Sequence, residues 1–230
     1  MKLRWILGWY LLYPLVKVFL GFRTEGRERL KRGMIIAANH TSNLDPFMLG
    51  LASKRELFFP AKVELFQISK SFAWLLKSFN AFPLHRGIMD LEILKRFIYL
   101  LKRGQTVAIF PEGTRSKSGE FLPFKPGVAF LAIATHTPVV PTYIYGISHS
   151  FLSYKFDRDI RNPTEEERRD GSFIRFFLRK RRLGVKFGFP IKPNNFKRRK
   201  EDYLNYTRRI NEEIKNLKKE VESYEKGYVN

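Results

Sequence analysis

The chain has 230 residues, which fits one domain with a substantial core. It contains no cysteine, which excludes disulfides and thiolate metal sites. Its 4 histidines are scattered without an HExxH pair, so we expect no metal site. The formal net charge of +21 predicts an anionic partner: nucleic acid, an anionic lipid surface, or an acidic protein or cofactor.

The N-terminal segment, residues 5–22, is apolar except for Lys17. A straight helix of this length would just span the ~30 Å hydrocarbon core of a bilayer, but Pro14 and Lys17 disfavour a spanning helix. No small-residue cleavage site of a signal peptide follows Leu20. Tryptophans and tyrosines among the aliphatic residues favour the membrane interface. We therefore predict a monotopic membrane anchor or interfacial helix at 1–22, with a buried core helix as the alternative.

After this segment, short apolar strands alternate with helical patterns. The expected strands are Met34–Ala38, Leu57–Pro60, Thr106–Phe110, Val139–Ile144 and Val185–Phe189. The helical patterns are Pro46–Ser53, Glu64–Phe79, Met89–Arg103 and Val128–Thr135. The alternation predicts one α/β domain at 23–230, with a central, mostly parallel or mixed sheet flanked by helices. Two prolines in TPVVPTYI (137–144) predict that this strand is bent or lies at an edge of the sheet.

Two later segments have helical patterns of different kinds. Residues 173–182 interleave phenylalanine with arginine and lysine, which predicts a basic amphipathic helix. Toward the C-terminus, apolar residues recur at helical spacing: Tyr203, Tyr206, Ile210, Ile214, Leu217 and Val221. A helix with one apolar face is expected to pack this face against the domain.

The turn NHTSNLD (39–45) places a histidine and an aspartate five residues apart, directly after a predicted strand. Asp45 precedes Pro46, so we expect the aspartate to cap the following helix. On this local pattern alone, His40 is compatible with an ordinary loop residue.

Charged residues recur at the ends of other predicted strands. Lys62, Arg86 and Arg115 each lie at, or shortly after, the carboxyl end of an apolar strand, as His40 does. In open α/β sheets, ligands bind at the carboxyl ends of the strands. We therefore expect these cations to converge on His40 and Asp45. A histidine oriented by an aspartate is a general base, and a cluster of cations binds phosphate.

The blocks NHTSNLD (39–45), FPLHR (82–86), FPEGTRS (110–116) and the VVP strand, followed by GVKFGFPI (184–191), occur in a characteristic order. This combination resembles the glycerolipid acyltransferase family, in particular its bacterial 1-acylglycerol-3-phosphate acyltransferases. The resemblance implies transfer of a fatty acyl group from acyl-CoA or acyl-carrier protein to the sn-2 hydroxyl of lysophosphatidic acid. The product would be phosphatidic acid, and no cofactor would be required.

The resemblance also implies roles for individual residues. His40 would be the general base and Asp45 would orient its imidazole. Lys62 and Arg115 would bind the acceptor phosphate, with Arg86 as a third cation. The supporting motif residues would be Asn39, Glu112, Gly113 and Thr114. The implied setting is the cytoplasmic face of the cell membrane, with membrane phospholipids and lysophosphatidic acid as partners.

The sequence fits other functions less well. A nucleic-acid-binding protein would explain the charge, but no helix-turn-helix, RNP or zinc-finger pattern is present, and the apolar N-terminus would have no role. The segment GISHS (146–150) lacks the last glycine of a hydrolase nucleophile elbow, and no GxxxxGK[ST] loop exists. Within the family, the alternative is acylation of another lysophospholipid or of glycerol 3-phosphate.

Overall fold

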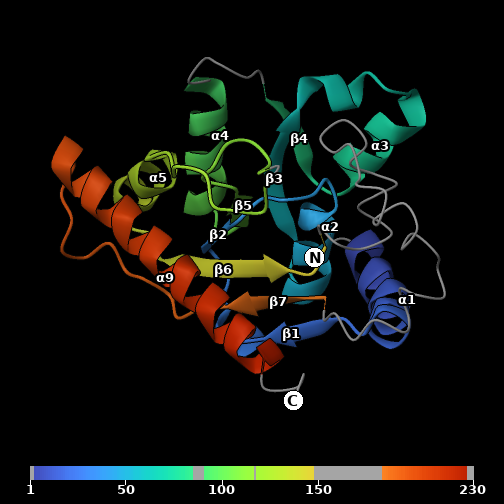
Figure 1. Ribbon diagram of the computed structural model, residues 1–230. Helices are drawn as coiled ribbons and strands as arrows, with labels where there is room; N and C mark the ends of the chain where they lie inside the picture. The colour runs from blue at the N-terminus through green and yellow to red at the C-terminus, as the bar shows by residue number, and fades with distance from the viewer. Residues whose placement is uncertain (1–2, 85–90, 117, 148–182, 227–230) are drawn as a thin grey trace.

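The computed structural model describes residues 3–84, 91–116, 118–147 and 183–226, which surround a 7-stranded sheet (Figure 1). The strands are β1 (Arg23–Glu25), β2 (Ile35–Ala38), β3 (Leu57–Lys62), β4 (Ala81–Leu84), β5 (Thr106–Ile109), β6 (Val139–Tyr145) and β7 (Gly184–Phe187). Their spatial order is β1-β7-β6-β2-β5-β3-β4. Neighbouring strands are parallel except β6 and β7. This mixed sheet confirms the predicted α/β fold.

β2 lies inside the sheet, where it pairs with β5 on one side and β6 on the other. Ile36 is in register with Ala108 of β5 and with Val140 of β6. All of β2 is buried, which explains why its sequence is a continuous apolar run. Because β6, β2, β5, β3 and β4 run parallel, the loops after β2, β3 and β5 leave the sheet along one edge.

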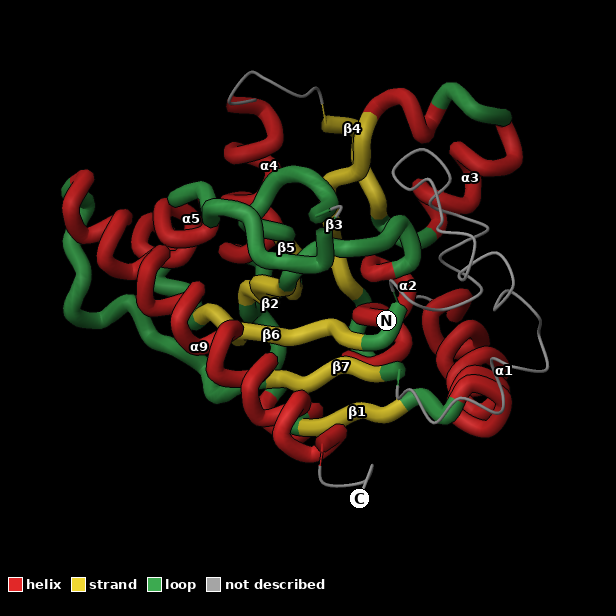
Figure 2. Tube along the Cα trace, in the orientation of Figure 1, coloured by secondary structure: helices red, strands yellow, loops and turns green. Residues whose placement is uncertain are grey.

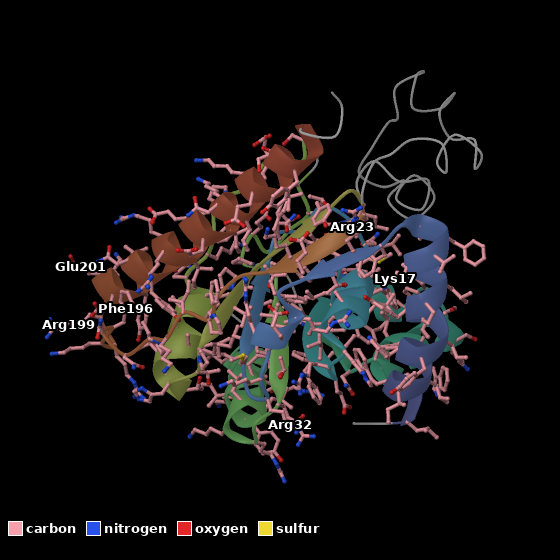
Figure 3. The ribbon with its side chains drawn as sticks, turned by 90° about the horizontal axis from the view of Figure 1, so that it is seen from below. Lys17, Arg23, Arg32, Phe196, Arg199 and Glu201 are labelled. Carbon is pink, nitrogen blue, oxygen red and sulfur yellow. The ribbon has the colours of Figure 1, made fainter. Side chains whose placement is uncertain are left out.

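Helices cover both faces of this sheet. They are α1 (Leu3–Leu20), α2 (Asp45–Ser53), α3 (Lys70–Ser78), α4 (Leu91–Lys102), α5 (Gly127–Thr135) and α9 (Lys200–Lys226). Alternate residues of β2 face opposite ways: Ile36 packs in a core layer with α1, α2 and α3, and Ile35 packs in a layer with α4, α5 and α9. Figure 2 and the view from below in Figure 3 show α1 and α9 on opposite sides of the sheet.

One predicted helix is divided in two. The segment expected as a single helix at Glu64–Phe79 forms a 3₁₀ turn at Val63–Phe66 and then α3. Between them, Ser69 has an extended backbone with φ −161° and ψ 157°. Its hydroxyl oxygen accepts a hydrogen bond from the Phe72 backbone N–H at 3.1 Å. This cap begins a new helix and changes the direction of the chain.

The VVP strand was predicted to be bent or at an edge of the sheet, and the edge alternative is wrong, because β6 lies between β2 and β7. The Pro141 carbonyl accepts a hydrogen bond from the Gly188 N–H, just beyond the end of β7, at 2.7 Å. A residue's N–H and C=O point to the same side of a strand. Pro141 has no N–H to donate toward β7, but the antiparallel pairing of β6 with β7 ends at this point. No hydrogen bond of the sheet is lost, so the proline is tolerated in an internal strand.

Helix α9 confirms the prediction that the C-terminal segment is a helix whose apolar face packs against the domain. Tyr206, Ile210 and Ile214 are fully buried against the sheet, and the Tyr206 hydroxyl donates to the Ile191 carbonyl at 2.7 Å. Burial raises the pKa of the Tyr206 phenol, which therefore remains protonated as a donor. The basic helix predicted at 173–182 lies outside the described residues.

Helix α1 continues through Pro14 and packs one side on the domain. Trp5 is buried in the core layer, and the Trp9 indole N–H donates to the Leu51 carbonyl of α2 at 3.0 Å. The opposite side exposes apolar side chains: Leu3, Leu7, Tyr10, Leu11, Leu12, Leu15, Val18 and Phe19. Among the described helices, none has the length and apolar content needed to cross a membrane.

Candidate active site

The loop after β2 is fixed by Asn39. The side-chain amide of Asn39 donates to the Ile144 carbonyl at 2.9 Å, and its oxygen accepts from the Ile144 N–H at 2.7 Å. These paired bonds continue the contact between β2 and β6 beyond the end of β2. They therefore determine where the next residue, His40, leaves the sheet.

His40 and Asp45 form a hydrogen-bonded pair. His40 Nδ1 lies 2.9 Å from Asp45 Oδ2, and the Asp45 side chain is fully buried. The same oxygen accepts from the backbone N–H groups of Thr41 at 2.6 Å and Ser42 at 2.8 Å. This oxygen already accepts from two backbone N–H groups, so the geometry fits the tautomer in which His40 Nδ1 donates to it as well. The lone pair of the neutral ring is then on Nε2, where it can act as a base.

The prediction that Asp45 caps α2 is wrong. Asp45 is the first residue of the helix, and Leu44 occupies the cap position with a helical backbone and no side-chain cap hydrogen bond. The carboxylate instead turns back into the preceding loop, where it bonds the N–H groups that follow His40. Asp45 therefore organises the histidine loop and not the helix start.

Phe110 holds the other side of the histidine ring. The two rings stack with centroids 4.2 Å apart and an interplanar angle of 19°. Phe110 directly follows β5, and the register of β2 with β5 pairs Ala37 with Ile109. The sequence did not single out Phe110 because only the strand order places it beside His40. Stacking and the bond to Asp45 together fix the ring orientation.

The FPEGTRS segment binds the backbone of His40. Glu112 is buried, and its carboxylate accepts from the His40 N–H at 2.9 Å and from the Leu122 N–H at 3.1 Å. The His40 carbonyl accepts from the Ser116 N–H at 2.8 Å. Burial raises the pKa of the Glu112 carboxyl, and the N–H bonds from Leu122 and His40 partly oppose this shift. Both backbone polar groups of His40 are thus held by the neighbouring loop.

Gly113 gives this loop its close turn. Its φ is +70°, in the left-handed region, and a Cβ there would lie 3.0 Å from the Lys125 ammonium nitrogen. The Lys125 backbone N–H donates to the Pro111 carbonyl at 2.9 Å, which ties this lysine to the same loop. Thr114 is exposed in the same turn.

A cavity of about 810 Å³ lies at the carboxyl edge of the sheet. His40, Lys62 and Arg115 line it, so the structure brings together these predicted site residues. Most of the remaining lining is apolar, including Phe59, Ile68, Phe72, Leu75, Leu84, Ile93, Phe97, Val128 and Leu131. Arg86 lies outside the described residues.

Lys125 is a third cation in this lining, and the sequence did not identify it. It belongs to none of the four motif blocks, and it follows FPEGTRS by several residues. Lys125 lies two residues before α5, at the carboxyl edge of the sheet where Lys62 and Arg115 also lie. This position is the feature that could have identified it.

The arrangement fits a molecule with an anionic group and a long apolar chain. The cations offer charge-assisted hydrogen bonds, and the apolar lining offers contacts for hydrocarbon. Within the described part of the chain, no group of His, Asp and Glu residues is placed to hold a metal ion. The described groups include a hydrogen-bonded histidine–aspartate pair, which is able to transfer a proton, and cations that are able to bind an anion.

Comparisons with known proteins agree with this combination of fold and site. Residues 21–145 match the family model described as Acyltransferase. A 1-acyl-sn-glycerol-3-phosphate acyltransferase of Brassica napus is 35% identical over 142 residues, which are 59% of this chain and 39% of that protein. The Bacillus subtilis (strain 168) protein of the same name is 35% identical over 131 residues, covering 56% of this chain and 64% of that protein.

A solved structure has a similar fold. It is the crystal structure of the 1-acyl-sn-glycerophosphate (LPA) acyltransferase PlsC from Thermotoga maritima, with a TM-score of 0.61. It is 24% identical, and the match covers 95% of this chain and 84% of that one. At this identity the likeness shows the fold alone.

The fold and site define an α/β protein with a histidine–aspartate pair at the carboxyl edge of its sheet. Since the family model matches more than half of the residues, the chain belongs to the acyltransferase family. The matches span less than two thirds of the length of the Brassica and Bacillus relatives.

We predict that Glu112→Ala lowers the free energy of unfolding by about 2–5 kcal/mol, because it leaves two backbone N–H groups without their acceptor. Glu112→Gln keeps one acceptor oxygen and should cost less. Urea unfolding measures both values, and amide hydrogen exchange should accelerate at His40 and Leu122. Glu120→Ala, an exposed glutamate in the same loop, is the control. Equal stability of Glu112→Ala and Glu120→Ala would contradict the assigned contacts.

Proposed function

We propose that this protein transfers a fatty acyl group from a thioester to the sn-2 hydroxyl of 1-acylglycerol 3-phosphate, forming phosphatidic acid in phospholipid biosynthesis. The observation that carries the proposal is the shared cavity: His40, which is bonded to the buried Asp45, borders one apolar chamber together with Lys62 and Arg115. The names of the relatives support the choice of acceptor.

His40 would act as the general base. The acceptor hydroxyl is almost un-ionised at neutral pH, and its attack requires removal of its proton. His40 Nε2 takes this proton while the oxygen bonds to the thioester carbonyl carbon. The carbon–sulfur bond then breaks, and the imidazolium returns the proton to the leaving thiolate. The acyl group passes directly to the acceptor, with no acyl-enzyme and no cofactor. The thioester is acyl-CoA or acyl-carrier protein.

Asp45 would keep His40 ready for this step. Its carboxylate accepts the Nδ1 proton, which leaves Nε2 as the basic nitrogen and stabilises the imidazolium that forms. The Phe110 stack and the backbone bonds to Glu112 and Ser116 limit motion of the ring. Such orientation lowers the entropic cost of reaching the reactive geometry.

The cations would bind the acceptor phosphate. Lys62 and Arg115 line the cavity with His40, and Lys125 contributes a further ammonium. The resemblance adds Arg86 to this group. A bound phosphate fixes which hydroxyl reaches His40 Nε2. The apolar lining favours an acceptor that already carries an acyl chain over the alternative, glycerol 3-phosphate. Another lysophospholipid remains the second candidate acceptor.

The setting we propose is the cytoplasmic face of the cell membrane, with α1 as a monotopic anchor. The exposed side of α1 is a contiguous apolar surface, a feature that marks membrane or protein contacts. The net charge of +21 adds attraction to anionic lipid. Apolar insertion and charge together bind more firmly than either alone.

We expect His40→Ala to lower turnover by about 10²–10⁴-fold, because the proposed general base is removed. Turnover is measured with labelled acyl-CoA and a panel of lysophospholipid acceptors, and the products are separated by chromatography. His136→Asn is the matched control, since His136 is exposed after α5 with φ +53°, which asparagine tolerates. A folded His40→Ala protein with more than half of the wild-type turnover would exclude His40 as the base.

Lys62→Ala, Arg115→Ala and Lys125→Ala should each raise the KM for the phosphate-bearing acceptor by roughly tenfold or more. Each removes a charge-assisted hydrogen bond of about 1.5–3 kcal/mol. The KM for the acyl thioester should change much less. The two constants are measured separately, with the exposed Lys102→Ala on α4 as the control. Equal changes in both constants would place these cations outside the acceptor site.

The anchor is tested on the exposed face of α1, because Trp5 and Phe22 are buried and deletion of residues 1–22 would open the core. The triple variant Leu11→Asp, Leu15→Asp, Val18→Asp should release most of the protein from anionic vesicles in flotation. High salt should release the remainder, since only charge attraction is screened. Wild type should stay bound in salt, and Leu204→Asp on α9 should behave like wild type. A triple variant that floats like wild type would refute the anchor.

A further inference from the structure

We propose that a second element contacts the bilayer: the segment Ile68–Lys77, here called the α3 lip. It includes Ile68, the cap Ser69 and most of α3. Its partner is the headgroup region of an anionic bilayer, and its role is to admit an acyl chain from the membrane into the cavity. This inference rests on the proposed function for the identity of that chain.

The outer face of the α3 lip has the composition of an interfacial surface. Lys70, Trp74 and Lys77 are four and three residues apart, so they lie along one side of α3. All three are exposed, and Trp74 retains 69% of its accessible surface. Tryptophan partitions into the membrane interface, and each flanking lysine adds attraction of about 1 kcal/mol to anionic lipid. No acidic residue occurs in α3, so nothing on the helix opposes this attraction.

The inner face of the same segment lines the cavity. Ile68, Phe72 and Leu75 all border the chamber that contains His40. Ile68 is also 65% exposed, so one apolar residue belongs both to the cavity wall and to the outer surface. The opening of the chamber is therefore assigned to the α3 lip, as part of this proposal. An acyl chain that enters here exchanges one apolar environment for another and avoids exposure to water.

The position of α3 beside α1 lets both meet one membrane. Phe79, directly after α3, packs edge to face on Trp5 of α1 with ring centroids 5.4 Å apart. A Cβ added at Gly8 of α1 would lie 3.9 Å from Phe79, an ordinary contact that confirms close packing. Figure 1 shows α1 and α3 on the same side of the sheet and α9 on the other. The α3 lip thus extends the surface that α1 presents, and it adds the opening to the cavity.

A fluorescence experiment tests the contact without reference to catalysis. The chain has 3 tryptophans, so Trp5→Phe with Trp9→Phe leaves Trp74 as the only one. Vesicles of phosphatidylglycerol and brominated phosphatidylcholine should shift its emission to the blue and quench it. The matched control replaces all natural tryptophans by phenylalanine and adds Leu204→Trp on α9, which should be neither shifted nor quenched by the same vesicles.

The same proteins supply the results that would overturn the contact. Trp74 fluorescence that responds no more than the Leu204→Trp probe refutes it. A blue shift that depends on protein concentration and needs no vesicles indicates self-association of the lip, and this also refutes it. If Trp5→Phe with Trp9→Phe unfolds, bromolipid quenching of wild type is compared with that of Trp74→Phe. Loss of Trp74 must then remove more than half of the quenching that the bromolipid causes in wild type; a smaller effect refutes the contact.

An activity experiment tests the role in substrate access. Trp74→Ser with Lys77→Ser, two exposed residues outside the cavity lining, should reduce acylation of a long-chain lysophosphatidic acid in vesicles by roughly tenfold, since contact with the anionic bilayer is lost. Acylation of a short-chain, water-soluble acceptor should be unchanged. Equal loss on both acceptors would mean that the lip only supports the fold, and no loss on either would exclude a role in access. Absence of acyl transfer by wild type would refute the proposed function instead, and the fluorescence result would still decide the membrane contact.

Discussion

The arrangement of the site depends on one buried carboxylate. Asp45 is fully enclosed, and a single oxygen accepts hydrogen bonds from His40 Nδ1 and from two backbone N–H groups of the same loop. Burial of a charge is costly unless hydrogen bonds compensate it, so the loop must close around Asp45 in this one conformation. The conformation that directs these three donors to Asp45 Oδ2 also orients the imidazole. Fold stability and the protonation pattern of His40 are therefore two results of the same contact.

The rest of the site extends this constraint outward from β2. Asn39 binds the loop to β6, and Glu112 and Ser116 bind the His40 backbone to the loop after β5. Both connections exist because β5 and β6 flank β2 in the sheet. The parallel strands also bring Lys62 and Arg115 to the same cavity. The sheet order thus brings motifs that are distant in sequence together in one chamber with a histidine, several cations and an apolar wall.

Part of this was predictable from the sequence. Apolar runs indicated most strands. The rule that ligands bind at the carboxyl ends of strands predicted that His40, Lys62 and Arg115 lie close together, because this rule requires only that the strands be parallel. Phe110 and Lys125 were missed, since their positions depend on which strands are neighbours. The cap role of Asp45 was predicted wrongly because an aspartate before proline has the same local pattern whether its carboxylate bonds the helix or the preceding loop. Pro141 shows the same limit, because tertiary contacts decided that its strand is internal. The restart of the helix at Ser69 instead depends on a local cap hydrogen bond, which the helical pattern of residues 64–79 did not reveal.

The central claim is that Asp45 acts through His40, and a double-mutant cycle tests it most directly. The kcat/KM values of wild type, His40→Ala, Asp45→Asn and the double variant are compared, using only proteins that unfold cooperatively in urea. If Asp45 acts through His40, Asp45→Asn should be strongly impaired when His40 is present, because an asparagine cannot maintain the required tautomer. In the His40→Ala background it should cause almost no further loss. Full additivity, with Asp45→Asn costing the same factor in both backgrounds, would contradict the account.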